Sequence, residues 1–164
     1  MAVEDKYVNT NVAAGKLANP ALQSGAQPKG FVVTFEVAVA DDNGSVYRLC
    51  RLPSSAILTK LDINADAITA GTDYDVGFYK VGVGGAVVDK DELADGLDLS
   101  SGAAIGSEAQ GLSAVDIANL GKKVYELLGL TVATKEEYYD LAITANTVGS
   151  AAGTITVRGE YIQG

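Results

Sequence analysis

The sequence predicts a mainly β protein, an antiparallel β-sandwich or jelly roll with one short helix and an extended N-terminal arm. Short runs in which apolar and polar side chains alternate recur along the chain, as in half-buried strands. Glycine is frequent, with 19 residues, and polar turns separate the runs, whereas a helical spacing of apolar residues occurs once. At 164 residues the chain has the size of one domain.

Residues 1–30 differ in composition from the rest of the chain. They mix Asn, Gln, Ala, Gly and Pro without a sustained period of two or 3.6 residues. We therefore expect an extended arm over 1–30, either free in solvent or docked on a surface, followed by a sandwich domain over 31–164. Val3, Tyr7, Val8 and Leu17 are the apolar anchors that a docked arm would use.

The domain begins with the clearest strand pattern of the sequence, from Phe31 to Val39, where every second side chain is apolar. Asn43-Gly44 follows, and both residue types tolerate the positive φ of a tight turn, so we expect a β-hairpin. The returning strand runs from Val46 to Leu52. Cys50 lies in this strand as the only cysteine of the sequence and is expected to be a small buried hydrophobe.

The remaining elements follow the same logic. Alternating runs predict strands at 56–64, 74–79, 138–144 and 154–162. The Gly-, Asp- and Ser-rich stretch 82–111 is expected to be an exposed excursion with one short strand near 86–88, and "GVGG" within it a flexible turn. "SAVDIANLGKKVYELLGL" has a helical stripe that Gly121 interrupts, which favours two short turns. The last strand is expected to lie inside a sheet or beneath a neighbouring copy.

The composition excludes several classes of function. The 21 acidic residues outnumber the 12 Lys and Arg, so a phosphate-binding surface is missing and nucleic acid is not an expected partner. The first residues lack the pattern of a signal peptide, and no segment approaches the ~18 apolar residues of a membrane span. We expect a protein of an aqueous compartment that does not bind membranes.

Catalytic chemistry has little support in the residues. The sequence contains no His, the commonest general base and a frequent metal ligand, so we expect neither an enzyme nor a cofactor. A carboxylate pair drawn from Asp62, Asp73, Asp75 and Asp140 stays open as a weaker alternative. Asp62, Asn64, Asp66 and Asp73 match an EF-hand spacing, but Ala67 replaces the required Gly, which favours a solvated acidic turn over a calcium site.

Three C-terminal segments, "LGKKVYELLGL", "YYDLAITAN" and "TVGSAAGTITVRGEYI", resemble those of small structural proteins of tailed bacteriophages. In these proteins a Gly-Lys-Lys-aromatic-Glu-Leu segment precedes a Tyr-Asp-aliphatic strand and a Gly-Thr-aliphatic last strand. The central "AILTKLDINADAITAGTDYDVGFY" resembles them as well, so the likeness spans roughly residues 30–164.

The resemblance implies a capsid decoration, or cement, protein with a jelly-roll-like fold on the outer surface of the virion, made in the host cytoplasm. Its implied partner is the major capsid protein, and a homotrimer or homodimer is compatible with the sequence. No catalytic residues come with the family. The candidate contacts to the capsid or to a neighbouring copy are Val3, Lys6, Tyr7, Val8, Lys16, Leu17 and Lys29.

A second hypothesis is a virion or tail-associated β-sandwich that binds host glycan. It would use exposed tyrosines together with the Asp-rich loops at 62–73 and 89–98.

Overall fold

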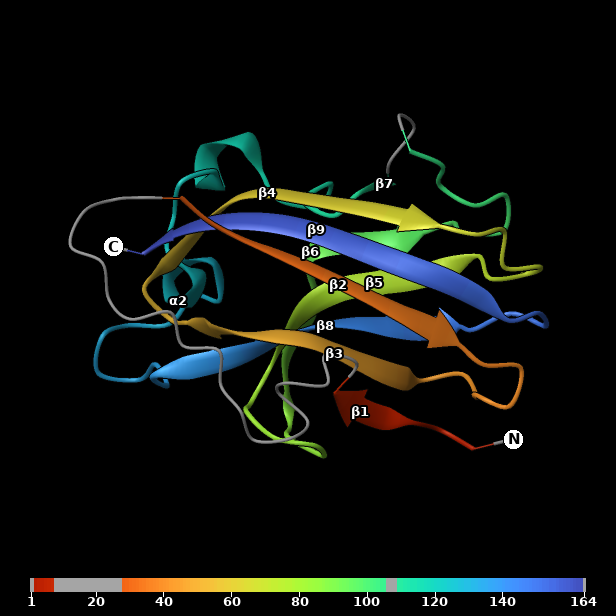
Figure 1. Cartoon of the computed structure of the whole chain (residues 1–164). Coiled ribbons are helices and arrows are strands. Elements are labelled where there is room, and N and C mark those ends of the chain that lie inside the picture. The colour runs from red at the N-terminus through yellow and green to blue at the C-terminus, as the bar shows by residue number, and fades with distance from the viewer. Residues whose placement is uncertain (1, 8–27, 106–108, 164) are drawn as a thin grey trace.

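The computed structural model describes residues 2–7, 28–105 and 109–163, which form two β-sheets packed face to face (Figure 1). This confirms the predicted mainly β sandwich. The elements in chain order are β1 (Asp5–Tyr7), β2 (Pro28–Val37), β3 (Ser45–Pro53), β4 (Ala56–Ala65), β5 (Asp73–Tyr79), β6 (Val87–Leu97), β7 (Ala109–Gln110), the 3-10 helix η1 (Ile117–Asn119), α2 (Val124–Leu127), β8 (Tyr138–Thr147) and β9 (Gly153–Gln163).

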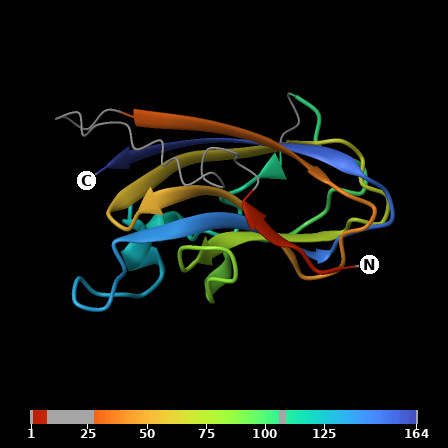
Figure 2. The ribbon, with the colours of Figure 1, turned by 60° about the horizontal axis from the view of Figure 1, so that its bottom comes forward.

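The strand order is β1-β3-β8-β5-β6 in one sheet and β2-β9-β4-β7 in the other. Figure 2 shows the two layers, with β2, β9 and β4 lying above β3, β8 and β5. All pairs of neighbouring strands are antiparallel except β1 and β3, which are parallel. The chain therefore crosses between the layers repeatedly, as in a jelly-roll-like sandwich.

The core fills the space between the inner faces of the two sheets. β2 buries every second residue up to its end at Val37, which confirms the alternation seen in the sequence. Across the gap, the rings of Phe35 and Tyr47 stack with their centroids 4.9 Å apart. Cys50 is buried, as expected for a small hydrophobe. Burial of apolar area is the main stabilising contribution to such a fold.

The predicted hairpin at Asn43-Gly44 is wrong, because β2 and β3 belong to different sheets. A tight turn does form there: Gly44 has a φ of 88°, and the Ser45 N–H donates to the Asp42 carbonyl at 3.1 Å. The Asn43 side chain also accepts a hydrogen bond from the Val148 N–H at 3.0 Å, which holds the turn against the next connection. Alternation reveals which face of a strand is buried but not which strand lies beside it.

The stretch 82–111 was expected to be largely an exposed excursion, and this is also wrong. It contains β6, an eleven-residue strand that pairs with β5 and buries Leu93 and Ala94. The pairing of β5 and β6 is interrupted by three register shifts, which bring two successive residues inward and destroy the period of two. The sequence pattern therefore indicated only the start of this strand, as the short strand expected near 86–88.

The helical segment consists of two short pieces, η1 and α2, with Gly121 between them at a φ of 91°. β9 lies between β2 and β4, so the last strand is internal to a sheet, one of the two predicted arrangements. Within the described part of the chain, no helix is long and apolar enough to cross a membrane.

Candidate functional site

The candidate arm residues are not brought together. Val3 and Lys6 lie on the segment 2–7 beside β3, and so does Tyr7 at the end of β1. Lys29 lies on β2 in the other sheet, where its Nζ donates to Gln163 Oε1 at 2.7 Å. The remaining candidates, Val8, Lys16 and Leu17, lie outside the described residues.

The best organised polar cluster surrounds Arg48, whose side chain is fully buried in β3. Its Nε and Nη2 donate to the two carboxylate oxygens of Asp5, at 2.7 and 3.1 Å, which is a bidentate pair. Its Nη1 lies 3.4 Å from the buried carboxylate of Asp140, which also accepts from Arg51 Nε at 3.2 Å. We call Arg48, Asp5 and Asp140 the Arg48 centre.

The same guanidinium holds the loop 80–86 between β5 and β6. Its Nη1 donates to the Lys80 carbonyl at 3.0 Å, and its Nη2 donates to the Gly85 carbonyl at 2.9 Å. The face of the guanidinium also lies over the Tyr79 ring, 5.0 Å from the centroid. Two main-chain oxygens of one loop thus point at a single buried cation.

The N–H groups of the loop complete the arrangement. Gly82 N–H donates to Asp140 at 3.0 Å, and Gly84 N–H donates to Asp5 at 2.8 Å. The "GVGG" turn predicted to be flexible therefore has its backbone bonded to both acids of the Arg48 centre. The sequence indicated only a turn, because it showed glycines but not their partners.

This fixed loop presents apolar side chains to solvent. Val81, Val83 and Val87 are 41%, 62% and 55% exposed. The loop projects from the sandwich in Figure 1. We call these three side chains the valine tip. Apolar side chains held on a backbone with this many hydrogen bonds are suited to contact with another surface.

Cys50 lies two residues after Arg48 on β3 and is not a nucleophile. Burial, and then the charge of Asp140, raise the pKa of its thiol far above the ordinary range. A thiolate is the reactive form of cysteine, so this side chain is a structural one.

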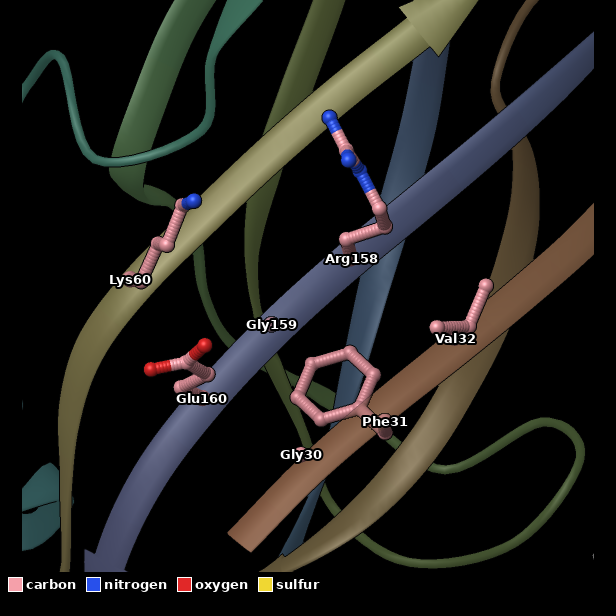
Figure 3. A pocket seen from close by; sticks show the side chains of 7 residues that line it. All are labelled: Gly30, Phe31, Val32, Lys60, Arg158, Gly159 and Glu160. Carbon is pink, nitrogen blue, oxygen red and sulfur yellow. The ribbon is translucent and has the colours of Figure 1, made fainter. Parts of the chain in front are cut away.

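A shallow depression crosses β2, β9 and β4 on the other sheet (Figure 3). The ring of Phe31 lies beside Gly159, where there is no side chain to cover it. Glu160, Lys60 and Arg158 are the charged residues of its lining. Lys60 is paired with Asp62 at 2.9 Å. The depression holds one carboxylate and so lacks the pair of acids that glycoside hydrolysis requires.

The fold separates Asp62 and Asp140 from the other acids proposed for catalysis and brings only Asp73 and Asp75 to one side chain. Asp140 belongs to the Arg48 centre and Asp62 to the opposite sheet, while Asp73 and Asp75 share the side chain of Asn146 on β8. Burial by itself would raise the pKa of Asp75, but hydrogen bonds from Asn146, Lys90 and the Gly96 N–H outweigh it and lower the pKa. A general acid needs the opposite shift.

The proposed calcium ligands have protein partners in the structure. Asn64 donates to the Ala103 carbonyl at 3.3 Å, and Asp66 accepts from the Thr154 N–H at 3.2 Å. Among residues 2–7, 28–105 and 109–163, no group of three or more His, Cys, Asp or Glu side chains is placed to hold a metal ion.

Four of the seven tyrosines whose side chains the structure describes are internal and so do not serve the glycan hypothesis. Tyr47, Tyr74, Tyr79 and Tyr139 are buried in the structure. Burial raises the pKa of the first three, which are therefore neutral phenols. An aromatic surface for stacking on a sugar ring is not formed by these side chains.

Asp89 and Asp91 lie close together on β6. We therefore expect Asp89→Asn to stabilise the folded protein by an amount that depends on pH. Burial, and then Asp91, raise the pKa of Asp89 above its ordinary value of 3.8. Its charge therefore destabilises the folded state at neutral pH. We expect Asp89→Asn to raise the urea midpoint at pH 7, and the gain to vanish as the pH falls below the unfolded-state pKa, where wild-type Asp89 is protonated in both states. A gain of equal size at pH 3 would contradict this account.

No family model matches the sequence, and no curated protein matches it. Chains from three solved phage capsid structures are similar to it over most of their length. They belong to the capsid of Ralstonia phage GP4 (17% identity, 88% of each chain, TM-score 0.45), to the cyanophage Pam1 capsid (18%, 90% of this chain and 93% of that chain, 0.49) and to the acid-stable capsid of Helicobacter pylori bacteriophage KHP30 (16%, 84% and 93%, 0.40). Similarity at this level assigns neither a family nor a function.

Proposed function

We propose that this chain is a structural protein of a bacteriophage particle, and more specifically a decoration protein that binds the outer surface of the capsid and stabilises it. The sequence resemblance over residues 30–164 supports the class. The observation that carries the proposal in the structure is the valine tip, exposed apolar side chains on a loop that the Arg48 centre holds in place.

The valine tip suits a large partner better than a small one. Sites for small molecules are concave and enclose most of their ligand. Val81 and Val83 are instead 41% and 62% exposed on the loop 80–86, which projects from the sandwich in Figure 1, so a broad apolar surface can cover them. Because hydrogen bonds to Arg48, Asp5 and Asp140 already order the loop, little conformational entropy is lost on binding.

The partner that fits is the major capsid protein, which presents the same surface many times on one lattice. Each individual contact can then be weak, because several linked contacts on one particle raise the overall affinity. A homo-oligomer with several valine tips would gain most from this effect. The division into an arm at 1–30 and a domain at 31–164 stays a prediction, since residues 8–27 lie outside the described structure.

The double variant Val81→Asp/Val83→Asp tests the proposal. We expect at least a tenfold loss of affinity for heads assembled from the major capsid protein of the same genome, because two carboxylates would lose their hydration on binding. The measurement is a sedimentation binding isotherm with purified heads. Both positions are exposed, so the fold should be kept, which circular dichroism can check.

The matched control is Val32→Asp, which introduces a carboxylate at another position that is 66% exposed. It lies on β2, in the sheet that does not contain β5 and β6. Binding that survives the double variant but not Val32→Asp would remove the valine tip from the proposal.

A further inference from the structure

Residues 2–7 bind along the edge of β3 that faces away from β8, as a peptide adds a strand to the edge of a sheet. β1 pairs in parallel with β3, with Asp5 beside Val46. Backbone hydrogen bonds extend the contact toward the N-terminal end of the segment: Ala2 N–H donates to the Ala40 carbonyl at 3.1 Å, and Asp42 N–H donates to the Ala2 carbonyl at 2.9 Å. This binding site, which we call the β3 edge, is thus formed by β3 and the connection that precedes it.

The β3 edge binds the side chains of residues 2–7 as well as their backbone. Asp5 pairs with both Nε and Nη2 of Arg48. Lys6 Nζ lies 3.6 Å from the Asp41 carboxylate and 5.4 Å from the centroid of the Tyr47 ring. Asp5 therefore faces a buried cation, and Lys6 faces a buried acid. These two pairs fix the register of residues 2–7 along β3.

The segment is separable from the hydrophobic core. Residues 2–6 do not belong to the clusters of buried apolar side chains, and Val3 is 62% exposed. They contribute hydrogen bonds and ion pairs to the edge of the sheet. β3 is paired with β8 along its other side, so the β3 edge persists without the segment.

Twenty residues, 8–27, separate β1 from β2 in the sequence. A chain of this length can span at most about 70 Å when fully extended. The segment 2–7 would therefore reach the β3 edge of a neighbouring molecule within this distance, and it would make the same contacts there as on its own body. Exchange of an identical element between copies is a low-cost route to an oligomer.

We propose that the β3 edge is an interaction site for residues 2–7 of a second copy of this chain, so that copies are joined by reciprocal exchange of β1. Each exchanged strand brings Asp5 to the Arg48 centre of its neighbour. The described contacts between residues 2–7 and β3 are kept in the exchanged form, and the linked copies present more than one valine tip to a surface.

A zero-length cross-link between Lys6 and Asp41, whose charged atoms lie 3.6 Å apart, tests the exchange. ¹⁵N-labelled and unlabelled chains are mixed in equal amounts while unfolded, refolded together, and coupled with a carbodiimide. If partners are drawn at random from the equimolar pool, about half of the Lys6–Asp41 cross-linked peptides should carry one labelled and one unlabelled half. Cross-linked peptides that are all uniformly labelled or unlabelled would overturn the proposal.

The control is internal to the same sample. Lys80 and Glu136 form an exposed pair 3.1 Å apart between segments that do not exchange, so their cross-link should stay unmixed. A second readout is the sedimentation mass: the wild type should be oligomeric and a variant lacking residues 2–7 monomeric. A monomeric wild type would contradict strand exchange and leave capsid binding through the valine tip to be decided by its own test.

Discussion

Replacing Arg48 with alanine should lower the free energy of unfolding by about 3–5 kcal/mol, because removal of one partner from a buried ion pair leaves uncompensated charge. Asp140 is fully buried and would lose this cation, while its pair with the partly exposed Arg51 remains. The carbonyls of Lys80 and Gly85 would lose their donors at the same time. Urea denaturation followed by circular dichroism measures the loss.

Arg51→Ala is the matched control for this prediction. Arg51 pairs with the same carboxylate of Asp140, but it is 18% exposed, whereas Arg48 has no exposed side-chain area. We expect its removal to cost much less, about 1 kcal/mol, as for a partly solvated pair. Equal losses in the two variants would show that the Arg48 centre has no special role in holding β1 and the loop 80–86.

Gly77→Ala should destabilise the protein by about 3 kcal/mol or more, the upper end of the cost of overpacking. A Cβ at position 77 on β5 would lie far inside van der Waals contact with the Asp89 carbonyl oxygen and the Lys90 carbonyl carbon on β6. These are backbone atoms, so relief requires β6 to move away from β5. The expected result is a lower urea midpoint and a loss of amide protection along β6.

The control for this second substitution is Gly30→Ala on β2. A Cβ there would meet only the Gly159 carbonyl oxygen, at 3.8 Å, which is an ordinary contact. Because alanine also suits a strand better than glycine does, we expect little change or a small gain. A Gly77→Ala protein as stable as Gly30→Ala would mean that β5 and β6 do not approach as closely as described.

The fold class could be predicted from the sequence because alternation survives in the central strands. β2 shows it over Phe31 to Val37, where one face meets the core and the other meets solvent. Alternation located β8 as a strand at 138–144, although that strand is buried on both faces, and it breaks down where a strand carries bulges, as in β6. The partner of each strand was also hidden, because Asn43-Gly44 specifies a turn and not the sheet to which the chain returns.

The Arg48 centre could not be predicted from sequence because its members are far apart along the chain. Asp5, Arg48 and Asp140 become neighbours through the order of strands, which a single sequence does not give. A local signal did exist in "YRLCRL", where two arginines stand in an otherwise apolar strand. A bulge between Arg48 and Cys50 brings two successive residues, Leu49 and Cys50, into the core, which the alternation did not reveal.

The central claim is that this sandwich acts by attachment to a repeating surface. The most direct measurement is sedimentation of the wild-type chain with purified heads of the phage whose genome encodes it, over a range of chain concentrations. The account predicts binding that saturates at a fixed ratio of this chain to the major capsid protein. A chain that stays in the supernatant at every concentration, while heads and chain are both intact, would contradict it.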